Sequence, residues 1–147
     1  AQAMLAPFEG KGDENPYTLH ADLQQCMQTL VGIIRTESEL RQALDEIARL
    51  KQRVEMVSVQ GNRQYNSAWH QALDLGCMLT VSEAITRAAI ERKESRGGHT
   101  RDDYPSTDPA LGKVNVVTRR VNGEMTSVLE PLPEMPDELK QIVEDKT

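Results

Sequence analysis

Apolar residues recur at steps of three and four along the first half of the chain, which is the spacing of one face of an α-helix. One such stretch opens at Asn15, which can cap a helix, and Pro16, whose missing N–H would be unpaired in a first turn anyway. A second opens at Thr36, and Glu39 three positions later completes a capping box. Because the connection is short, the two helices are predicted to form an antiparallel hairpin.

A third helical stretch begins near Asn66 and continues to about Lys93, which is long for a helix of a globular protein. Its middle, over residues 73–81, is apolar or small on nearly every face. A helix of this kind needs neighbours on most sides. Self-association of the chain is therefore expected wherever a docking face is left uncovered.

The pattern changes at Glu94, after which glycines and prolines favour an irregular loop. Residues 114–121 and 125–129 are strand-like and flank Asn122 and Gly123, the dipeptide most typical of a tight hairpin turn. The sequence therefore predicts one β-hairpin after the helices.

The predicted fold is mainly α: a three-helix bundle whose third helix is long, followed by an irregular loop, a β-hairpin and a C-terminal tail. Residues 1–15 are assigned to an N-terminal linker and residues 16–105 to the helical bundle domain with its polar loop. Residues 106–147 form the hairpin and tail of the same domain, and the tail ends in a short helix over residues 137–145.

Composition excludes several functional classes. The 147 residues include 17 Lys plus Arg and 23 Asp plus Glu, a net charge of −6, so the sequence-wide basic excess of a nucleic-acid-binding protein is missing. No apolar run approaches the roughly 18 residues of a membrane span, so no direct membrane insertion is expected. Cys26 and Cys77 fall within amphipathic patterns without a CxxC pair or a histidine at metal spacing, and both are predicted to be reduced core residues.

The loop over residues 94–103 carries the densest candidate chemistry. Arg96, His99 and Arg101 surround two glycines, and paired arginines suit a carboxylate or a phosphate. A dicarboxylate or phosphate site is one interpretation. The acidic residues of the same loop, which are Glu94, Asp102 and Asp103, can instead neutralise the cations, and the loop would then fix a helix end and dock against another surface. An exposed loop without a special role is the third interpretation.

Arg35 follows two isoleucines and is either an anion contact or a cap for the carboxyl end of the first helix. The chain contains no GxGxxG, P-loop, nucleophile elbow or HExxH pattern. No catalytic, cofactor-binding or metal-binding residue is therefore predicted in it.

Residues 88–105, AAIERKESRGGHTRDDYP, resemble the R-K-E-S-R-G-A-H-x-R-x-D-x-P segment of succinate dehydrogenase and fumarate reductase flavoproteins. Matches at Asn15-Pro16 and residues 31–37 extend the resemblance over residues 15–105, and more loosely over the hairpin. Gly98 stands where the family usually has Ala, and residues 105–108 replace its Arg-Asp-Asp run. These departures indicate a divergent branch, and L-aspartate oxidase and adenylylsulfate reductase share parts of the pattern.

The resemblance implies that this is the C-terminal helical domain of a flavoprotein subunit. FAD would be bound by a large amino-terminal domain, and succinate or fumarate beneath a capping domain, so no catalytic or cofactor-binding residue carries over and the chain alone is expected to be inactive. Electrons would pass to an iron–sulfur subunit and a quinone-reactive membrane anchor. The expected location is cytoplasmic, peripheral on the inner face of the membrane through the parent complex.

The residues expected at the interface with the flavin domain are Arg35, Glu94, Ser95, Arg96, His99 and Arg101. The hypothesis is that Arg96, His99 and Arg101 bond carbonyls and carboxylates across that junction. Two other classes stay open: a stand-alone helical protein-interaction module, and a small anion-binding enzyme centred on the loop.

Overall fold

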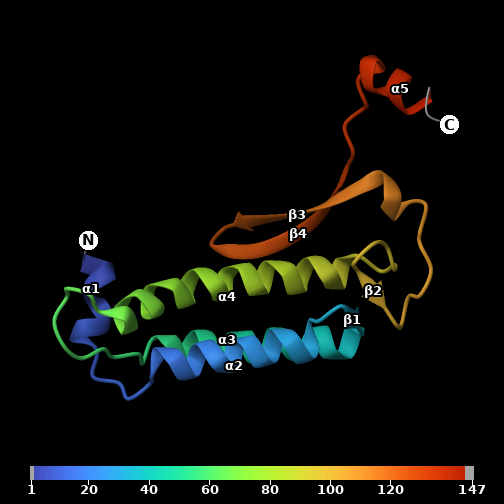
Figure 1. The fold of residues 1–147 in the computed structure, drawn as a ribbon. Helices are drawn as coiled ribbons and strands as arrows, with labels where there is room; N and C mark the ends of the chain where they lie inside the picture. Colours follow the sequence, from blue (N-terminus) through green and yellow to red (C-terminus); the bar gives the residue numbers. More distant parts are fainter. Residues whose placement is uncertain (1, 145–147) are drawn as a thin grey trace.

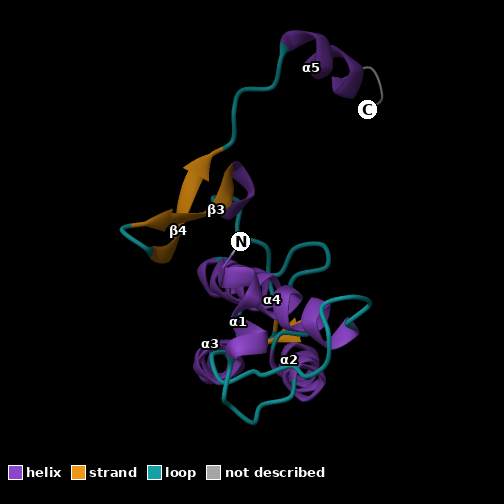
Figure 2. Ribbon diagram, turned by 90° about the vertical axis from the view of Figure 1, so that its left-hand side faces the viewer, coloured by secondary structure: helices purple, strands orange, loops and turns teal. Residues whose placement is uncertain are grey.

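Three long helices form the body of the molecule in a computed structural model that describes residues 2–144. They are α2 (Pro16–Leu30), α3 (Glu37–Val54) and α4 (Ser67–Glu91). Seen along their axes in Figure 2, they occupy the corners of a triangle, and Figure 1 shows α2 and α3 side by side below α4. The predicted mainly α fold with a helical bundle and a hairpin is confirmed.

Each of the three helices starts at a residue whose side chain caps it, and two of these residues, Asn15 and Thr36, were predicted to do so. Asn15 accepts a hydrogen bond from the N–H of Tyr17, and Asn66 accepts one from the N–H of Trp69. Thr36 Oγ1 accepts from the N–H of Glu39 at 3.3 Å. These bonds satisfy N–H groups that have no partner inside the helix, so the sequence placed the helix starts correctly.

The core lies between the three helices and consists of aliphatic side chains with little aromatic material. Leu19, Leu40, Ile47 and Leu75 are each buried to 1% exposure or less. Cys26 is also buried, as predicted, but Cys77 is exposed on α4, so the prediction that it is a core residue is wrong. Helical spacing alone could not show which face of α4 the bundle covers.

The amino-terminal segment differs from the predicted linker because residues Gln2–Glu9 form a helix, α1. Phe8 packs against Trp69 of α4, with ring centroids 5.4 Å apart, and the indole N–H of Trp69 donates to the carbonyl of Met4 at 2.7 Å. These tertiary contacts, rather than a capping signal or helix propensity, hold the helix. It closes the end of the bundle at which α4 begins (Figure 1).

Arg53, at the end of α3, fixes the segment between α1 and α2. Its guanidinium binds both carboxylate oxygens of Glu14, at 2.6 and 3.0 Å, and the carboxylate of Asp22 at 2.8 Å. The backbone of Gly12 lies directly against the backbone of Met56 in the same region. This close approach requires a residue without a side chain.

Gly12→Ala is therefore expected to lower the free energy of unfolding by about 1–3 kcal/mol, because the added Cβ would overlap the carbonyl oxygen of Met56. Urea denaturation followed by circular dichroism measures the change. The matched control is Gly76→Ala inside α4, where a Cβ would meet nothing within 4 Å. That change should instead raise stability by about 0.5–1 kcal/mol, and two variants of equal stability would contradict the expectation.

Two short strands that the sequence did not predict join the far ends of the helices. Residues Ile34–Arg35 form β1 and Thr100–Arg101 form β2, and they pair in parallel, Ile34 with Thr100 and Arg35 with Arg101. The region after α2 was interpreted only as an interruption, and the region after α4 only as a loop. Their pairing places the polar loop beside the carboxyl end of α2 (Figure 1).

The predicted hairpin is confirmed as β3 (Val114–Val121) and β4 (Glu124–Pro131), which follow a short 3-10 turn at Leu111–Lys113. Asn122 and Gly123 both have positive φ, at 52° and 89°, as a type I′ turn requires. The hairpin lies across α4 (Figures 1 and 2).

A final helix, α5 (Asp137–Glu144), confirms the predicted short helix within the described residues, and the predicted last residue, Asp145, lies outside them. Figures 1 and 2 show α5 away from the bundle at the end of an extended segment. Every residue of that arm whose side chain is described, from Pro131 to Ile142, is exposed. The arm therefore contributes little to the stability of the bundle.

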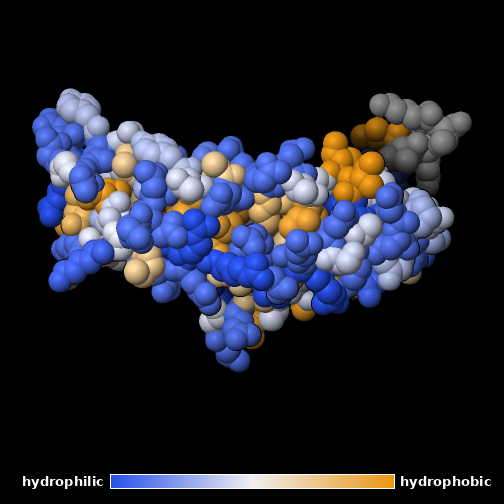
Figure 3. Space-filling view, turned by 90° about the horizontal axis from the view of Figure 1, so that it is seen from below, coloured by the Kyte–Doolittle hydropathy of each residue, from blue (hydrophilic) through white to orange (hydrophobic). Residues whose placement is uncertain are grey.

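One stripe of α4 is left uncovered although α4 contacts α1, α2, α3 and both strands of the hairpin. Val81 and Ile85 are 57% and 45% exposed, and Ile33 and Ile34 after α2 are 72% and 63% exposed. Figure 3 shows a strongly hydrophobic patch at the right-hand end of the molecule, the end at which α2 passes into β1 in Figure 1. Part of the exposed apolar surface therefore lies at this end.

Candidate functional site

The polar loop after α4 is organised around a buried carboxylate, Glu94, which is 0% exposed. One of its oxygens accepts from Arg92 Nη1 at 2.5 Å and Arg96 Nε at 3.0 Å. The other accepts from Arg96 Nη2 at 3.0 Å and from the backbone N–H of Asp108 at 2.8 Å. Arg92 also donates to the carbonyl of Leu111 at 3.1 Å. Glu94 therefore joins the end of α4 to the segment that leads into the hairpin.

A second buried charge, the guanidinium of Arg101, joins the loop to α3 and α4. Nε and Nη2 bind the two oxygens of Asp103 at 2.7 and 2.8 Å, and Nη2 also binds Glu37 at 2.9 Å. Nη1 donates to the carbonyl of Ala89 at 2.8 Å, and the ring of Tyr104 lies 5.0 Å from the guanidinium carbon. Arg101 is 0% exposed, and all its bonding nitrogens are used inside the chain.

The two carboxylates at these centres are held in the ionised form. The bonds from Arg96 lower the pKa of Glu94 from 4.5 to about 2, against the effect of burial. Arg101 lowers the pKa of Asp103 from 3.8 to about 2, and the backbone N–H of Glu37 at the start of α3 contributes to this shift through a 2.9 Å bond. Both groups therefore depend on cationic partners within the chain.

The loop itself turns tightly between the two centres. Arg96 and His99 exchange two backbone hydrogen bonds at 2.8 and 3.1 Å, and Gly97 in this turn has a φ of 59°. A Cβ added at Gly98 would meet nothing within 4 Å, so this position can hold either the Gly of this chain or an Ala. Ser95 Oγ accepts from the N–H of Arg101 at 2.8 Å and fixes the return of the chain.

His99 connects the loop to the end of α2. Its Nδ1 lies 2.7 Å from Arg35 Nη1, and its Nε2 lies 2.9 Å from the carbonyl of Arg92. Because a guanidinium only donates and a carbonyl only accepts, Nδ1 must be the acceptor and Nε2 must carry the proton. Burial and the nearby arginine charges also lower the pKa of His99. The imidazole is therefore neutral, in a single tautomer.

Arg35 differs from the other charged residues of the site. Its Nε donates to the carbonyls of Gly32 and Val31, at 2.5 and 3.2 Å, so its predicted role as a cap of the first helix is confirmed. Arg92, Arg96 and Arg101 each pair with a carboxylate, but Arg35 forms no ion pair among the described residues. Burial and the charge of Arg101 lower its pKa.

The six predicted site residues are thus brought to one end of the bundle. The carbonyls and carboxylates that Arg96, His99 and Arg101 bind are supplied by the chain itself, so the loop is self-paired, as one interpretation of the sequence expected. Its docking against another surface stays a prediction. Arg92 and Glu37, which were not among the predicted site residues, also belong to this cluster. Glu37 lies 64 positions before Arg101, and no local pattern connects residues so far apart.

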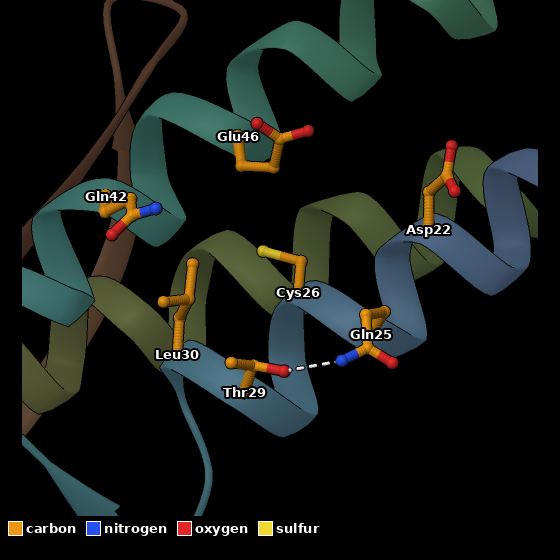
Figure 4. Close-up of a pocket in the computed structure, with 7 residues that line it drawn as sticks. All are labelled: Asp22, Gln25, Cys26, Thr29, Leu30, Gln42 and Glu46. Carbon is orange, nitrogen blue, oxygen red and sulfur yellow. Dashed lines mark hydrogen bonds between the residues drawn. The ribbon is translucent and has the colours of Figure 1, made fainter.

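The groove between α2 and α3 is a different kind of surface. It has a volume of about 460 Å³, and its lining includes Cys26, Leu30 and Glu46 (Figure 4). Burial and then the charge of Glu46 raise the pKa of the Cys26 thiol, so a reactive thiolate is disfavoured. Gln25 and Thr29 at its rim are bonded to each other at 2.7 Å. No cluster of three or more potential metal ligands occurs within residues 2–144.

A family model described as the C-terminal part of the fumarate reductase flavoprotein matches residues 20–143. The chain belongs to this family. The match includes most of α2, all of α3 and α4, the polar loop, the hairpin and almost all of the described part of the arm.

Relatives in the family are flavoproteins or FAD-dependent oxidoreductases. The chain is 38% identical over 97 residues to an uncharacterised FAD-dependent oxidoreductase of Methanocaldococcus jannaschii, covering 66% of this chain and 17% of the relative. It is 35% identical over 99 residues to the fumarate reductase flavoprotein subunit of Haemophilus influenzae, covering 67% and 16%. The chain therefore spans about one sixth of the length of these relatives.

Among solved structures, the Sdh1 complex of Mycobacterium smegmatis with UQ1 contains a chain that is 46% identical to this one. The two superpose with a TM-score of 0.90 over 97% of this chain and 25% of the other. An adenylylsulfate reductase of Archaeoglobus fulgidus, 22% identical with a TM-score of 0.79 over 90% of this chain and 24% of the other, shares the fold. The family thus uses this bundle as one part of a longer polypeptide.

Proposed function

We propose that this chain is the carboxy-terminal domain of a flavoprotein subunit that interconverts succinate and fumarate, and that it supports the FAD-binding part of that subunit. The observation that carries the proposal is the family match over residues 20–143, joined to a site whose loop charges are nearly all paired within the domain. Such a loop shapes a surface rather than binding a substrate.

The described residues do not fit FAD. A flavin dinucleotide needs unpaired N–H groups at a helix N-terminus or in a glycine-rich loop for its pyrophosphate. Here Asn15 caps α2, Asn66 caps α4, and Thr36 and Asp103 together occupy the N-terminus of α3. This supports assigning FAD, substrate and catalytic residues to other parts of the polypeptide.

The partners of this domain are inferred from the family to which the chain belongs. We infer contacts with the FAD-binding and capping domains in the same polypeptide, and with an iron–sulfur subunit and a membrane anchor in the assembled complex. None of the helices in residues 2–144 has the length and apolar character needed to cross a membrane. Under the proposal, the parent subunit reaches the inner face of the membrane through its anchor.

The whole natural gene product tests the proposal. It is expected to contain one FAD per polypeptide and to reduce a dye with succinate or oxidise a reduced viologen with fumarate. Titration of the present chain with succinate, fumarate and malonate should give no heat. A gene product without flavin, or one that oxidises only aspartate or acts only on adenylyl sulfate, would contradict it.

A further inference from the structure

We propose that Arg35 receives a carboxylate from the flavin-binding part of the same polypeptide, on a surface that also exposes the apolar side chains of Ile33, Ile34 and Ile85. This inference rests on the proposed function and names the chemistry of the contact. It also separates Arg35 from the other five predicted interface residues, which act by shaping the loop.

Arg35 carries a positive charge that its bonding partners do not neutralise. Its Nε and Nη1 bind two carbonyls and the neutral ring of His99, and none of these groups carries a compensating negative charge. Its Nη2 has no hydrogen bond within the described part of the chain. A half-buried guanidinium without a counter-ion is costly. A carboxylate from a partner would neutralise the charge and could accept hydrogen bonds from the guanidinium.

Exposed isoleucines lie on the surface near Arg35. Ile33, Ile34 and Ile85 are 72%, 63% and 45% exposed, and Arg35 and Ile85 both line an open groove of about 850 Å³ between α2 and α4. Apolar side chains around an arginine are the usual composition of an interface centre. The hydrophobic patch in Figure 3 lies at this same end of the bundle.

The occupant of this surface is the remainder of the same polypeptide. The chain covers 25% of the similar Mycobacterium smegmatis chain and 16–17% of the relatives from Methanocaldococcus jannaschii and Haemophilus influenzae. In such relatives most of the polypeptide lies outside this domain. Because it is covalently linked to the domain, it can contact this surface at a high effective concentration. We therefore assign the carboxylate to that part of the polypeptide.

The test compares Arg35→Gln, which removes the charge, with Arg35→Glu, which reverses it. In the present chain alone, the charge of Arg101 is already paired with Asp103 and Glu37, so the Gln and Glu variants should unfold at about the same temperature. In the whole gene product, a facing carboxylate should make the Glu variant less stable than the Gln variant. The temperature at which flavin fluorescence is released should fall by about 5 °C for Gln and further for Glu.

Arg41→Gln is the matched control, because Arg41 is 65% exposed and pairs with Glu37 away from this surface. It should leave the flavin-release temperature unchanged. If Gln and Glu at position 35 release flavin at the wild-type temperature, or at the same temperature as each other, the proposal is overturned while the proposed function stands. A gene product without flavin overturns both.

A second copy of the chain is the other possible occupant, and sedimentation distinguishes it. The chain alone is expected to remain monomeric at micromolar concentration if the surface fits the flavin-binding part. The proposal is rejected if the chain forms a dimer that Ile85→Arg dissociates and if Arg35→Glu has no effect on flavin release in the whole protein. The surface would then serve self-association.

Discussion

Arg101→Ala is expected to lower the free energy of unfolding of the chain by about 3 kcal/mol, because Arg101 is a fully buried cation with several partners. The substitution leaves the carboxylates of Glu37 and Asp103 and the carbonyl of Ala89 without their donor. Breaking a buried pair costs about 3–5 kcal/mol, and the lower figure applies because the Glu37 and Asp103 side chains keep 29% and 28% exposure.

Urea denaturation measures this loss, and the midpoint of thermal unfolding should fall by about 10 °C. Arg41→Ala removes another arginine from the same Glu37, but Arg41 is 65% exposed, so the change should cost only about 0.3–0.5 kcal/mol. Similar losses for the two variants would show that the burial of Arg101 has no energetic consequence.

Glu94→Gln is expected to cause the second large loss of stability, and that loss should depend on pH. The folded state holds the pKa of Glu94 at about 2, below its ordinary 4.5. A carboxylate with a lowered pKa contributes stability that is fully present above its ordinary pKa and is lost as the pH falls toward its folded value. The gap in stability between wild type and variant should therefore be widest near neutral pH and shrink between about pH 4.5 and 2.

Urea midpoints at several pH values test this expectation, and at pH 2 the gap should be about half or less of the gap at pH 7. His99 changes stability at higher pH in both proteins, because its pKa is lowered and the unfolded chain binds a proton first as the pH falls below about 6.5. That contribution cancels in the comparison. The control is Glu55→Gln, at an exposed position after α3, which should have the same urea midpoint as wild type at each pH. If the difference in stability between wild type and Glu94→Gln does not change with pH, the role given to the Glu94 carboxylate is contradicted.

Features that depend on neighbouring residues could be predicted from the sequence. Asn15 and Pro16 start α2, Thr36 and Glu39 start α3, and Asn122 with Gly123 turns the hairpin, because each signal acts over a few positions. The resemblance of residues 88–105 was equally local and led to the family that the comparisons confirm.

Features that depend on distant contacts could not be predicted. Helix α1 contains Pro7 and exists because Phe8 meets Trp69. The pairing of Arg101 with Glu37 and of β1 with β2 joins residues more than sixty positions apart. The exposure of Cys77 likewise depends on which helix covers which side of α4. Periodicity gives a helix its apolar stripe but does not say where its neighbours lie.

The parallel pairing of β1 with β2 also sets an order of events during folding. Ile34 and Thr100 can meet only after the chain between them has closed a long loop, and the entropy lost in that closure must be compensated by other contacts. Packing of α2, α3 and α4 supplies those contacts first, because each of these helices forms from nearby residues. We therefore expect residues 94–103 to become ordered late, on a bundle whose three long helices have already packed.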